Sequence, residues 1–388
     1  MYNSDVSKAT IIILLSIIII LIVILASIIV FQDRSTTTAT AVTDVENEIV
    51  VNEQIQENKT IENEITVVPT LLDSLKNNTT WCGTFQLVWN DMQDNLVDGG
   101  GGGDVVFEPQ ISIVENLNKQ DFKSEYLSEK SYYKEWGIKN TKLRDKIETN
   151  IKKKFNETSD ILDLIDWSNS SEENTDSLNY LFYAMLKKEF EFKNDFDKLE
   201  NGTFGNIYEN IEYFGITSES KKNLYNQVEV LYYIDSENYA VSLDTIQKDK
   251  VILVRNPQGN NFNEIYSNIE VEKNEYTGDK SFTENDTLKV PNINMDIFKE
   301  YKELEGKSFK SKNEKNIVID QAMQTIKMSL NNEGGFIKSE AAIANKSILQ
   351  SSESRNFNFD DTFGIFLIEN GKEKPYFASI VTNVTLFQ

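Results

Sequence analysis

The sequence contains no histidine and only one cysteine, and these two absences remove several classes of functional site. Without an imidazole there can be neither a Ser-His-Asp or Cys-His catalytic site nor a zinc site with histidine ligands. Cys82 has no second cysteine with which to form an intrachain disulfide or a Cys-x-x-Cys pair. We therefore expect a fold without disulfides and a protein that uses neither a metal nor a cofactor.

Positive charge is also scarce in this chain. Its 388 residues include 39 lysines and arginines against 62 aspartates and glutamates, and the formal net charge is −23. Because this excess of negative charge repels polyphosphate, we expect no nucleic-acid partner. Hydrophobic residues make up 39% of the chain and aromatic residues 11%, which is enough for a sizeable core.

One long stretch lacks charge altogether, since residues 9–31 consist mainly of isoleucine and leucine. As a helix, this stretch would extend roughly 34 Å, which is enough to cross a hydrocarbon core of about 30 Å. A cleaved signal peptide is the alternative, but its apolar part is usually only about 7–15 residues long. We predict a transmembrane signal-anchor at residues 9–31, with residues 1–8 as a short cytoplasmic head.

The charges beside this helix bear on its orientation, because Lys8 lies on one side and Arg34 next to Asp33 on the other. We expect a single-pass protein of the cell membrane whose large C-terminal domain is extracytoplasmic. Residues 32–67 are acidic and contain no aromatic residue, so they have little to bury against a core. They are predicted to be a disordered acidic tether that precedes a folded domain at residues 68–388.

Hydrophobic spacing within this domain predicts helices first and strands later. Apolar residues recur at helical spacing over Thr84 to Leu96, whereas the second half consists of β-branched and aromatic runs separated by polar turns. The predicted strands are Val228–Ile234, Tyr239–Leu243, Val251–Val254, Phe363–Ile368 and Pro375–Val381. This order predicts the α+β fold class.

A cluster of lysines between Lys139 and Lys154 stands out in so acidic a chain. It lies in a charged, helix-prone segment and could dock an anionic polymer or a lipid surface. The alternative is a solvated helix face, which is what most charged runs are.

Several further segments have a distinctive order along the domain. They are Tyr183–Asp197, Leu288–Phe309, Val318–Gly335, Ser339–Ala344, Phe359–Ile368 and Pro375–Asn383. This order resembles that of the serpin family over most of residues 68–388. The resemblance implies a large central mixed β-sheet with additional sheets and a set of helices. It also implies that Leu288–Ile293 is a strand-Pro-strand segment followed by a helix.

The resemblance assigns a hinge and a reactive loop to the region after the central strand. The hinge residues would be Asn332, Glu333, Gly334, Gly335, Ser339, Glu340, Ala341 and Ala342, and the reactive loop would occupy about 336–358. Two departures from the family pattern lie here. Gln324 stands where the family has a histidine in the central strand, and residues 335–338 look like a short insertion in the hinge.

The loop sequence can be tested against the demands of strand insertion, which buries every second side chain. Nearly all odd-numbered positions from Ile337 to Leu349 are small or apolar, whereas Lys338, Glu340 and Lys346 are even-numbered. The opposite parity would bury these charges at a cost of several kcal/mol each. Insertion is therefore compatible with one parity only. The alternative is an ordinary long polar surface loop.

The bond attacked by a protease is predicted to lie near the middle of this loop. The candidates are Ile348, Leu349, Gln350, Ser351, Ser352 and Glu353. Leu349 would attract a chymotrypsin-like or subtilisin-like protease, and Arg355 would attract a trypsin-like protease if the register were shifted further.

Three functions follow from these patterns. The resemblance implies a membrane-tethered suicide inhibitor of extracytoplasmic serine or cysteine proteases, which itself supplies no catalytic group. Phe336, Lys338 and Gln324 favour the alternative of a non-inhibitory serpin-fold binding or scaffold module on the cell surface. A third function would be a hydrolase that uses carboxylate pairs such as Asp163 with Asp166 or Asp360 with Asp361, but an acidic chain contains many such pairs by chance.

Overall fold

The computed structural model describes residues 64–97, 103–158, 162–163, 165, 167, 177–188, 190–335 and 354–388. They belong to one compact unit that extends from Glu62 to Gln388. The predicted cytoplasmic head, the transmembrane helix and most of the tether lie outside the described residues. Among the residues described, no helix is both long and apolar enough to cross a membrane.

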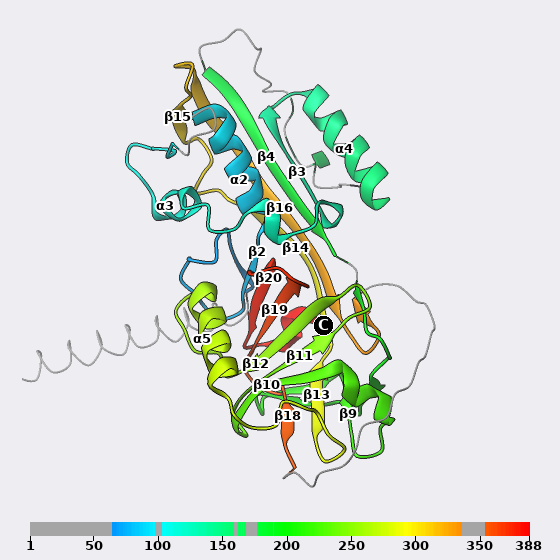
Figure 1. Cartoon of the computed structure of the whole chain (residues 1–388). Helices are drawn as coiled ribbons and strands as arrows, with labels where there is room; N and C mark the ends of the chain where they lie inside the picture. Colours follow the sequence, from blue (N-terminus) through cyan, green and yellow to red (C-terminus); the bar gives the residue numbers. More distant parts are fainter. Residues whose placement is uncertain are drawn as a thin grey trace, which may run out of the picture. The chain divides into compact units, whose positions relative to one another are not determined.

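A seven-stranded sheet forms the centre of the domain (Figure 1). Its order is β1 (Thr66–Val68), β2 (Thr79–Cys82), β20 (Phe377–Val381), β19 (Phe363–Glu369), β12 (Asp249–Arg255), β11 (Asn238–Asp244) and β10 (Val228–Asp235). All neighbouring strands are antiparallel except β1 and β2. Consecutive β-branched and aromatic residues make these strands apolar, as is typical of strands that are buried on both faces.

A second, mixed sheet contains the longest strands of the domain. Its order is β14 (Ile293–Glu300), β16 (Asn316–Leu330), β4 (Ser177–Lys187) and β3 (Tyr132–Ile138), and the short β15 (Ser308–Lys310) also pairs with β16. The two central strands, β16 and β4, are parallel, whereas the pairs at the edges are antiparallel.

The remaining strands form three small sheets. One has the order β18 (Asn356–Asn358), β13 (Thr287–Pro291), β9 (Tyr213–Ile216) and β6 (Asp197–Lys198), and the two others pair β17 (Gly334–Gly335) with β5 (Phe190–Glu191) and β7 (Gly202–Phe204) with β8 (Tyr208–Ile211). The helices are α2 (Thr84–Met92), which continues as a π-helical turn at Gln93–Val97, α3 (Ser112–Asn118), α4 (Thr141–Phe155) and α5 (Phe262–Glu275). Short 3-10 helices occupy Ser124–Tyr126, Glu129–Ser131, Lys222–Gln227 and Val384–Phe387.

Two helices cover opposite faces of the mixed sheet, because successive side chains of β4 point to opposite sides. Phe182 and Ala184 pack into a cluster with the apolar residues of α2. Leu181 and Tyr183 pack on the other face against α4. The Asn140 side chain caps α4 at its N-terminus, and Asn156 ends the helix in a left-handed conformation.

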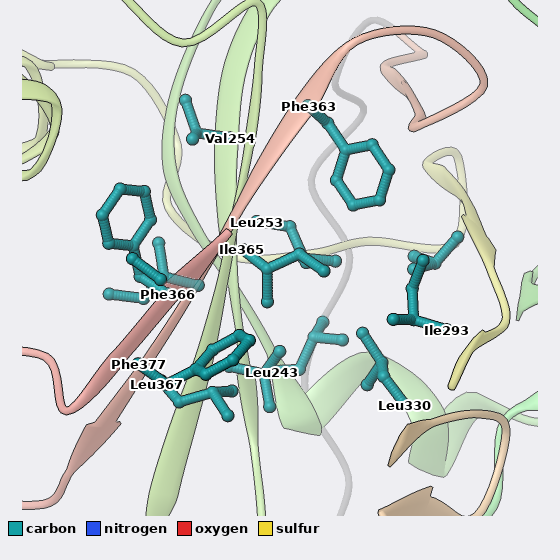
Figure 2. Packing of buried hydrophobic residues seen from close by; sticks show 14 of the residues in the cluster. Leu243, Leu253, Val254, Ile293, Leu330, Phe363, Ile365, Phe366, Leu367 and Phe377 are labelled. Atoms are coloured by element: carbon teal, nitrogen blue, oxygen red, sulfur yellow. The ribbon is translucent and has the colours of Figure 1, made fainter. Parts of the chain in front are cut away.

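The end of β16 is anchored in the main hydrophobic core. Leu330 pairs with Ile293 of β14, and both side chains are buried together with Leu243 and Ile365 of the seven-stranded sheet. Figure 2 shows Ile293 and Leu330 beside each other in this cluster. The two large sheets therefore share one core at this end of β16.

Most of the predicted elements are found, and four regions differ. The helix at Thr84 and the five strands of the second half are present. The charged segment before α4 also contains β3, and the residues after β14 form turns and β15 rather than the helix that the resemblance implied. Thr66 and Val67, assigned to the tether, belong to β1. Asn356–Asn358, assigned to the reactive loop, form β18 because they pair with β13 and bury Phe357.

Candidate functional site

The central strands β16 and β4 separate at one end, and we call this end the fork. They pair in parallel from Asn316 and Ser177 to Lys327 and Lys187. Beyond that point β16 continues to Leu330, and the chain turns back into β17. β17 pairs antiparallel with β5, the strand that follows β4. β17, which contains the first residues after the turn, therefore lies between the end of β16 and β5.

Hydrogen bonds from the Asn331 side chain and from neighbouring backbone groups hold the turn at the fork. The Asn331 side-chain oxygen accepts from the backbone N–H groups of Glu333 and Gly334, at 2.9 and 3.2 Å. The carbonyl oxygens of Asn332 and Glu333 accept from the backbone of the segment after β5, at 2.9 and 3.0 Å. The four hinge residues that the structure describes, 332–335, are thus held by both strands of the fork.

Two glycines are required because the fork is too narrow for a side chain. Gly334 has a φ of +126°, and a Cβ there would overlap the carbonyl oxygen of Phe190. A Cβ on Gly335 would lie 2.5 Å from the carbonyl oxygen of Ser329 and 3.1 Å from the Phe190 ring. The Phe190 ring is fully buried in the main core. The side of Gly335 on which a Cβ would stand therefore faces the core.

A buried polar network holds β16 midway along its length, and Gln324 is its centre. The Gln324 amide donates to the Cys82 carbonyl oxygen at 3.0 Å and to Thr84 Oγ1 at 2.7 Å, and its Oε1 accepts from the Tyr301 hydroxyl at 2.7 Å. Gln324 and Tyr301 are fully buried. The glutamine that departs from the family pattern therefore ties β16 to the start of α2 and to the turn after β14.

Cys82 belongs to this network but is not a reactive thiol. Its side chain is fully buried and lies 3.3 Å from Thr84 Oγ1. Burial raises the pKa of the Cys82 thiol to about 11, so the thiol is protonated at neutral pH and is a poor nucleophile.

The substitution Gln324→Leu should lower the free energy of unfolding by about 2–3 kcal/mol, because it leaves buried donors and acceptors without partners. Gln321→Leu on the same strand is the matched control, since its Oε1 already lacks a partner within the described structure. Urea unfolding of both variants measures the difference. Equal losses would contradict the assignment of a stabilising network to Gln324.

The far end of the loop region is fixed by a buried ion pair between Arg355 and Asp286. Arg355 donates to both carboxylate oxygens of Asp286, at 3.0 and 2.8 Å, and to the carbonyl oxygens of Asp279 and Ser281. Asp286 is fully buried and Arg355 is 8% exposed. The prediction that Arg355 could serve as a trypsin-like cleavage site is therefore wrong, because a protease cannot reach this side chain.

The remaining predicted site residues are not described by the structure. They are the hinge residues Ser339, Glu340, Ala341 and Ala342, and the reactive-bond candidates Ile348, Leu349, Gln350, Ser351, Ser352 and Glu353. What the sequence did not reveal is the pairing of β17 with β5. The adjacent glycines were the only local signal for a close approach of two backbones.

The predicted basic patch is partly neutralised by acids of the same domain. Lys139 is buried and pairs with Asp320 at 2.5 Å, and Lys146 pairs with Glu135 at 2.8 Å. The lysines of the last turn of α4, residues 152–154, are exposed. The C-terminal end of this helix is therefore the part of the patch where an anionic polymer or lipid would find three neighbouring exposed lysines.

The described carboxylates that were considered for a hydrolase pair with cations. Asp163 pairs with Arg144 at 2.5 Å, and Asp360 pairs with Lys289 at 3.2 Å. Asp166 lies outside the described residues. No group of three or more potential ligand side chains within the described ranges is arranged to hold a metal ion. These contacts offer no support for a hydrolase.

One carboxylate has a strongly shifted pKa, and it lies in the turn after β14. Partial burial and the neighbouring Glu300 carboxylate raise the pKa of Glu305 from 4.5 to about 7. Because the folded state holds this proton at a pH where the unfolded state has lost it, stability should fall as the pH rises from about 4.5 through 7.

Glu305→Gln should therefore raise the melting temperature at pH 8 and leave it nearly unchanged at pH 4.5. Thermal unfolding followed by circular dichroism from pH 4.5 to 8 tests this expectation. Glu303→Gln, an exposed position in the same turn, is the control. A Glu305→Gln variant whose pH profile has the wild-type slope would contradict the shifted pKa.

Comparisons with known proteins find similarity only among solved structures. No family model matches the chain, and no curated protein matches its sequence. Mouse protein-Z dependent protease inhibitor is similar with a TM-score of 0.49 and 11% identity, over 79% of this chain and 91% of that chain. Serpin48 of the insect Tenebrio molitor has a TM-score of 0.44 and 11% identity, over 80% of this chain and 92% of that chain. A serpin of the trematode Schistosoma haematobium has a TM-score of 0.37 and 11% identity, over 63% of each chain.

Proposed function

We propose that this chain is a serpin-like protein and that the segment after Gly335 is a bait loop that inserts between β16 and β4 once it is cut. The observation that carries the proposal is the position of β17, which occupies the fork and already runs antiparallel to β5. Insertion would extend β17 along the same line and would require the parallel pair of β16 and β4 to separate.

The orientation of Gly335 supports the insertion parity that the loop sequence demands. A Cβ on Gly335 would lie 3.1 Å from the fully buried Phe190 ring. Because side chains alternate along a strand, residues 337, 339 and 341 would share this inward side in a continuous strand. The charged Lys338 and Glu340 would then lie on the other side of the sheet.

The sheet geometry supports insertion on energetic grounds. β16 and β4 are parallel, so a strand that enters between them from the fork is antiparallel to both. One parallel pair is thereby replaced by two antiparallel pairs, and an antiparallel pair is slightly more stable per residue. The inserted strand would also bury apolar side chains such as Ile337 and Ile343.

In this mechanism the catalytic groups belong to the target protease, and this chain contributes only the loop that inserts. The nucleophile of the protease attacks the loop and forms an acyl-enzyme, and insertion of the cut loop then distorts that acyl-enzyme before water releases it. We further propose that residues 9–31 anchor the protein in the cell membrane and that residues 32–67 hold the domain near extracytoplasmic proteases.

The decisive experiment is to incubate the protein with chymotrypsin and with subtilisin and to search for a complex that survives SDS. We expect such a complex with wild type and its loss in Leu349→Asp if Leu349 precedes the cut bond. Mass spectrometry of the released C-terminal fragment identifies the bond. Complete cleavage of the loop by both proteases without any SDS-stable complex would refute inhibition.

A second candidate function, a non-inhibitory binding or scaffold module, is favoured by the Gln324 network. Its three hydrogen bonds tie β16 to Cys82, Thr84 and Tyr301, and they would break if β16 moved away from the start of α2. A module of this kind would be cut in the loop as an ordinary substrate, with no change in stability.

A further inference from the structure

A pocket of about 440 Å³ lies at the C-terminal ends of α4 and β4. It is lined by residues from five segments: residues 128–131, the last turn of α4, the end of β4, the turn between β11 and β12, and the end of β19. This volume lies within the range of about 300–1,000 Å³ that is typical of small-molecule sites. None of the hinge residues that the structure describes, 332–335, lines this pocket.

A buried ion cluster forms the floor of the pocket. Lys188 is 6% exposed and pairs with Glu369 at 2.6 Å and with Asp249 at 3.1 Å. Its ammonium group also lies 5.0 Å from the centre of the Tyr376 ring. The two acids of the pocket lining are therefore already occupied by a lysine that solvent barely reaches.

The rim of the pocket carries positive charge that these acids do not neutralise. Lys187 pairs with Glu157 at 3.1 Å. In contrast, no carboxylate of the described residues forms an ion pair with Lys130, Lys154 or Lys248, which are all exposed. These three lysines come from three different segments and line the same pocket.

The ammonium group of Lys154 lies close to two aromatic rings. Its ammonium group lies 5.6 Å from the centre of the Tyr132 ring and 5.7 Å from that of the Phe155 ring. Burial lowers the pKa of Lys154, and the nearby Glu129 only partly opposes this effect. A bound anion would stabilise the charged form of this lysine.

We propose that this pocket binds a small soluble phosphorylated compound. All the cationic side chains among the described residues that line it are lysines. Lysine ammonium groups bind phosphate as point charges, and a phosphate dianion gains more from several such charges than a singly charged carboxylate does. In a chain with a net charge of −23, three unpaired lysines that converge on one concave site form a local field for a dianion.

Titration calorimetry of the full chain with glucose 6-phosphate tests the proposal, with glucose as the uncharged control. We expect saturable binding of glucose 6-phosphate only. The variant Lys154→Gln with Lys248→Asn should raise the Kd about tenfold or more, because it removes two of the three unpaired charges. Asn is chosen at position 248 because the backbone there has a φ of +67°, which asparagine tolerates well.

The matched control is Lys152→Gln with Lys153→Gln, which removes the same charge from the exposed side of the same helix turn. We expect its Kd to stay within about twofold of wild type. Equal losses in both double variants, or the absence of saturable binding by wild type, would overturn the proposal. Sedimentation with vesicles that contain phosphatidylinositol 4-phosphate, without binding of glucose 6-phosphate, would also overturn it and would assign the lysines to a lipid surface.

A second readout on the wild-type chain does not depend on the folding of variants. Reductive methylation with a 13C label keeps the lysine charge and makes each lysine visible by NMR. Glucose 6-phosphate should shift the signals of Lys130, Lys154 and Lys248 and leave those of Lys152 and Lys153 in place. Shifts of equal size at all five lysines would show diffuse attraction and no pocket site.

Discussion

Cleavage of the chain between Ile348 and Glu353 is expected to raise the melting temperature by on the order of 10 °C. Insertion would bury Ile337, Ile343 and Leu349, and each such side chain contributes about 1.5–3 kcal/mol when it is fully buried. For a domain of this size, a gain of several kcal/mol corresponds to a shift of on the order of 10 °C. Differential scanning calorimetry before and after limited proteolysis with subtilisin measures this shift.

A substitution in the fork separates insertion from other effects of the cut on stability. Gly335→Glu places a side chain against Ser329 and the Phe190 ring, so the cut loop should be unable to enter and the rise should disappear. The matched control is Gly371→Asn, a position with a φ of +76° where an added Cβ meets nothing within 4 Å. Its cleaved form should show the full rise.

An unchanged melting temperature after complete cleavage of wild type would exclude insertion and would leave the binding module as the remaining function. A rise that persists in Gly335→Glu would show that the stabilisation arises outside the fork. Both outcomes are read from the same scans, together with the mass of the cleaved fragment.

The substitution Asp286→Ala is expected to lower the free energy of unfolding by about 3–5 kcal/mol. It leaves the Arg355 guanidinium in a buried site without the carboxylate that receives two of its hydrogen bonds, and removing one partner of a buried ion pair has an effect of this size. It also removes the acceptor of the Thr283 backbone N–H group. Urea unfolding gives the difference in free energy.

The double variant Asp286→Leu with Arg355→Met is the control for this pair. Because both charges are removed together, we expect it to recover a large part of the stability lost in Asp286→Ala. A loss below about 1 kcal/mol in Asp286→Ala would indicate a solvent-screened pair and would contradict the buried anchor at the end of the loop.

The strands of the domain could be predicted where the side chains themselves favour strands. Val251–Val254 and Phe363–Ile368 are continuous apolar runs, and they pair as β12 and β19 at the centre of the large sheet. Tyr132–Ile138 was missed as β3 because Lys134 and Glu135 interrupt its apolar pattern. The strand lies at the edge of the mixed sheet, where partial exposure accommodates these charges.

The candidate sites depend on contacts between residues that are far apart in the sequence. The resemblance assigned Gly334 and Gly335 to the hinge, but only the structure places them beside Phe190. The same holds for the pocket, since no local pattern relates Lys154 to Lys248. The hinge could be anticipated from resemblance, whereas the fork and the lysine pocket require the fold.

The absence of histidine has a consequence at the centre of the mixed sheet. The network around Gln324 consists of an amide, two hydroxyl groups and a backbone carbonyl, none of which changes its charge between pH 5 and 8. A fall in pH from 8 to 5 therefore leaves the protonation of this network unchanged, and these three contacts of β16 should be the same in a neutral and in an acidified compartment.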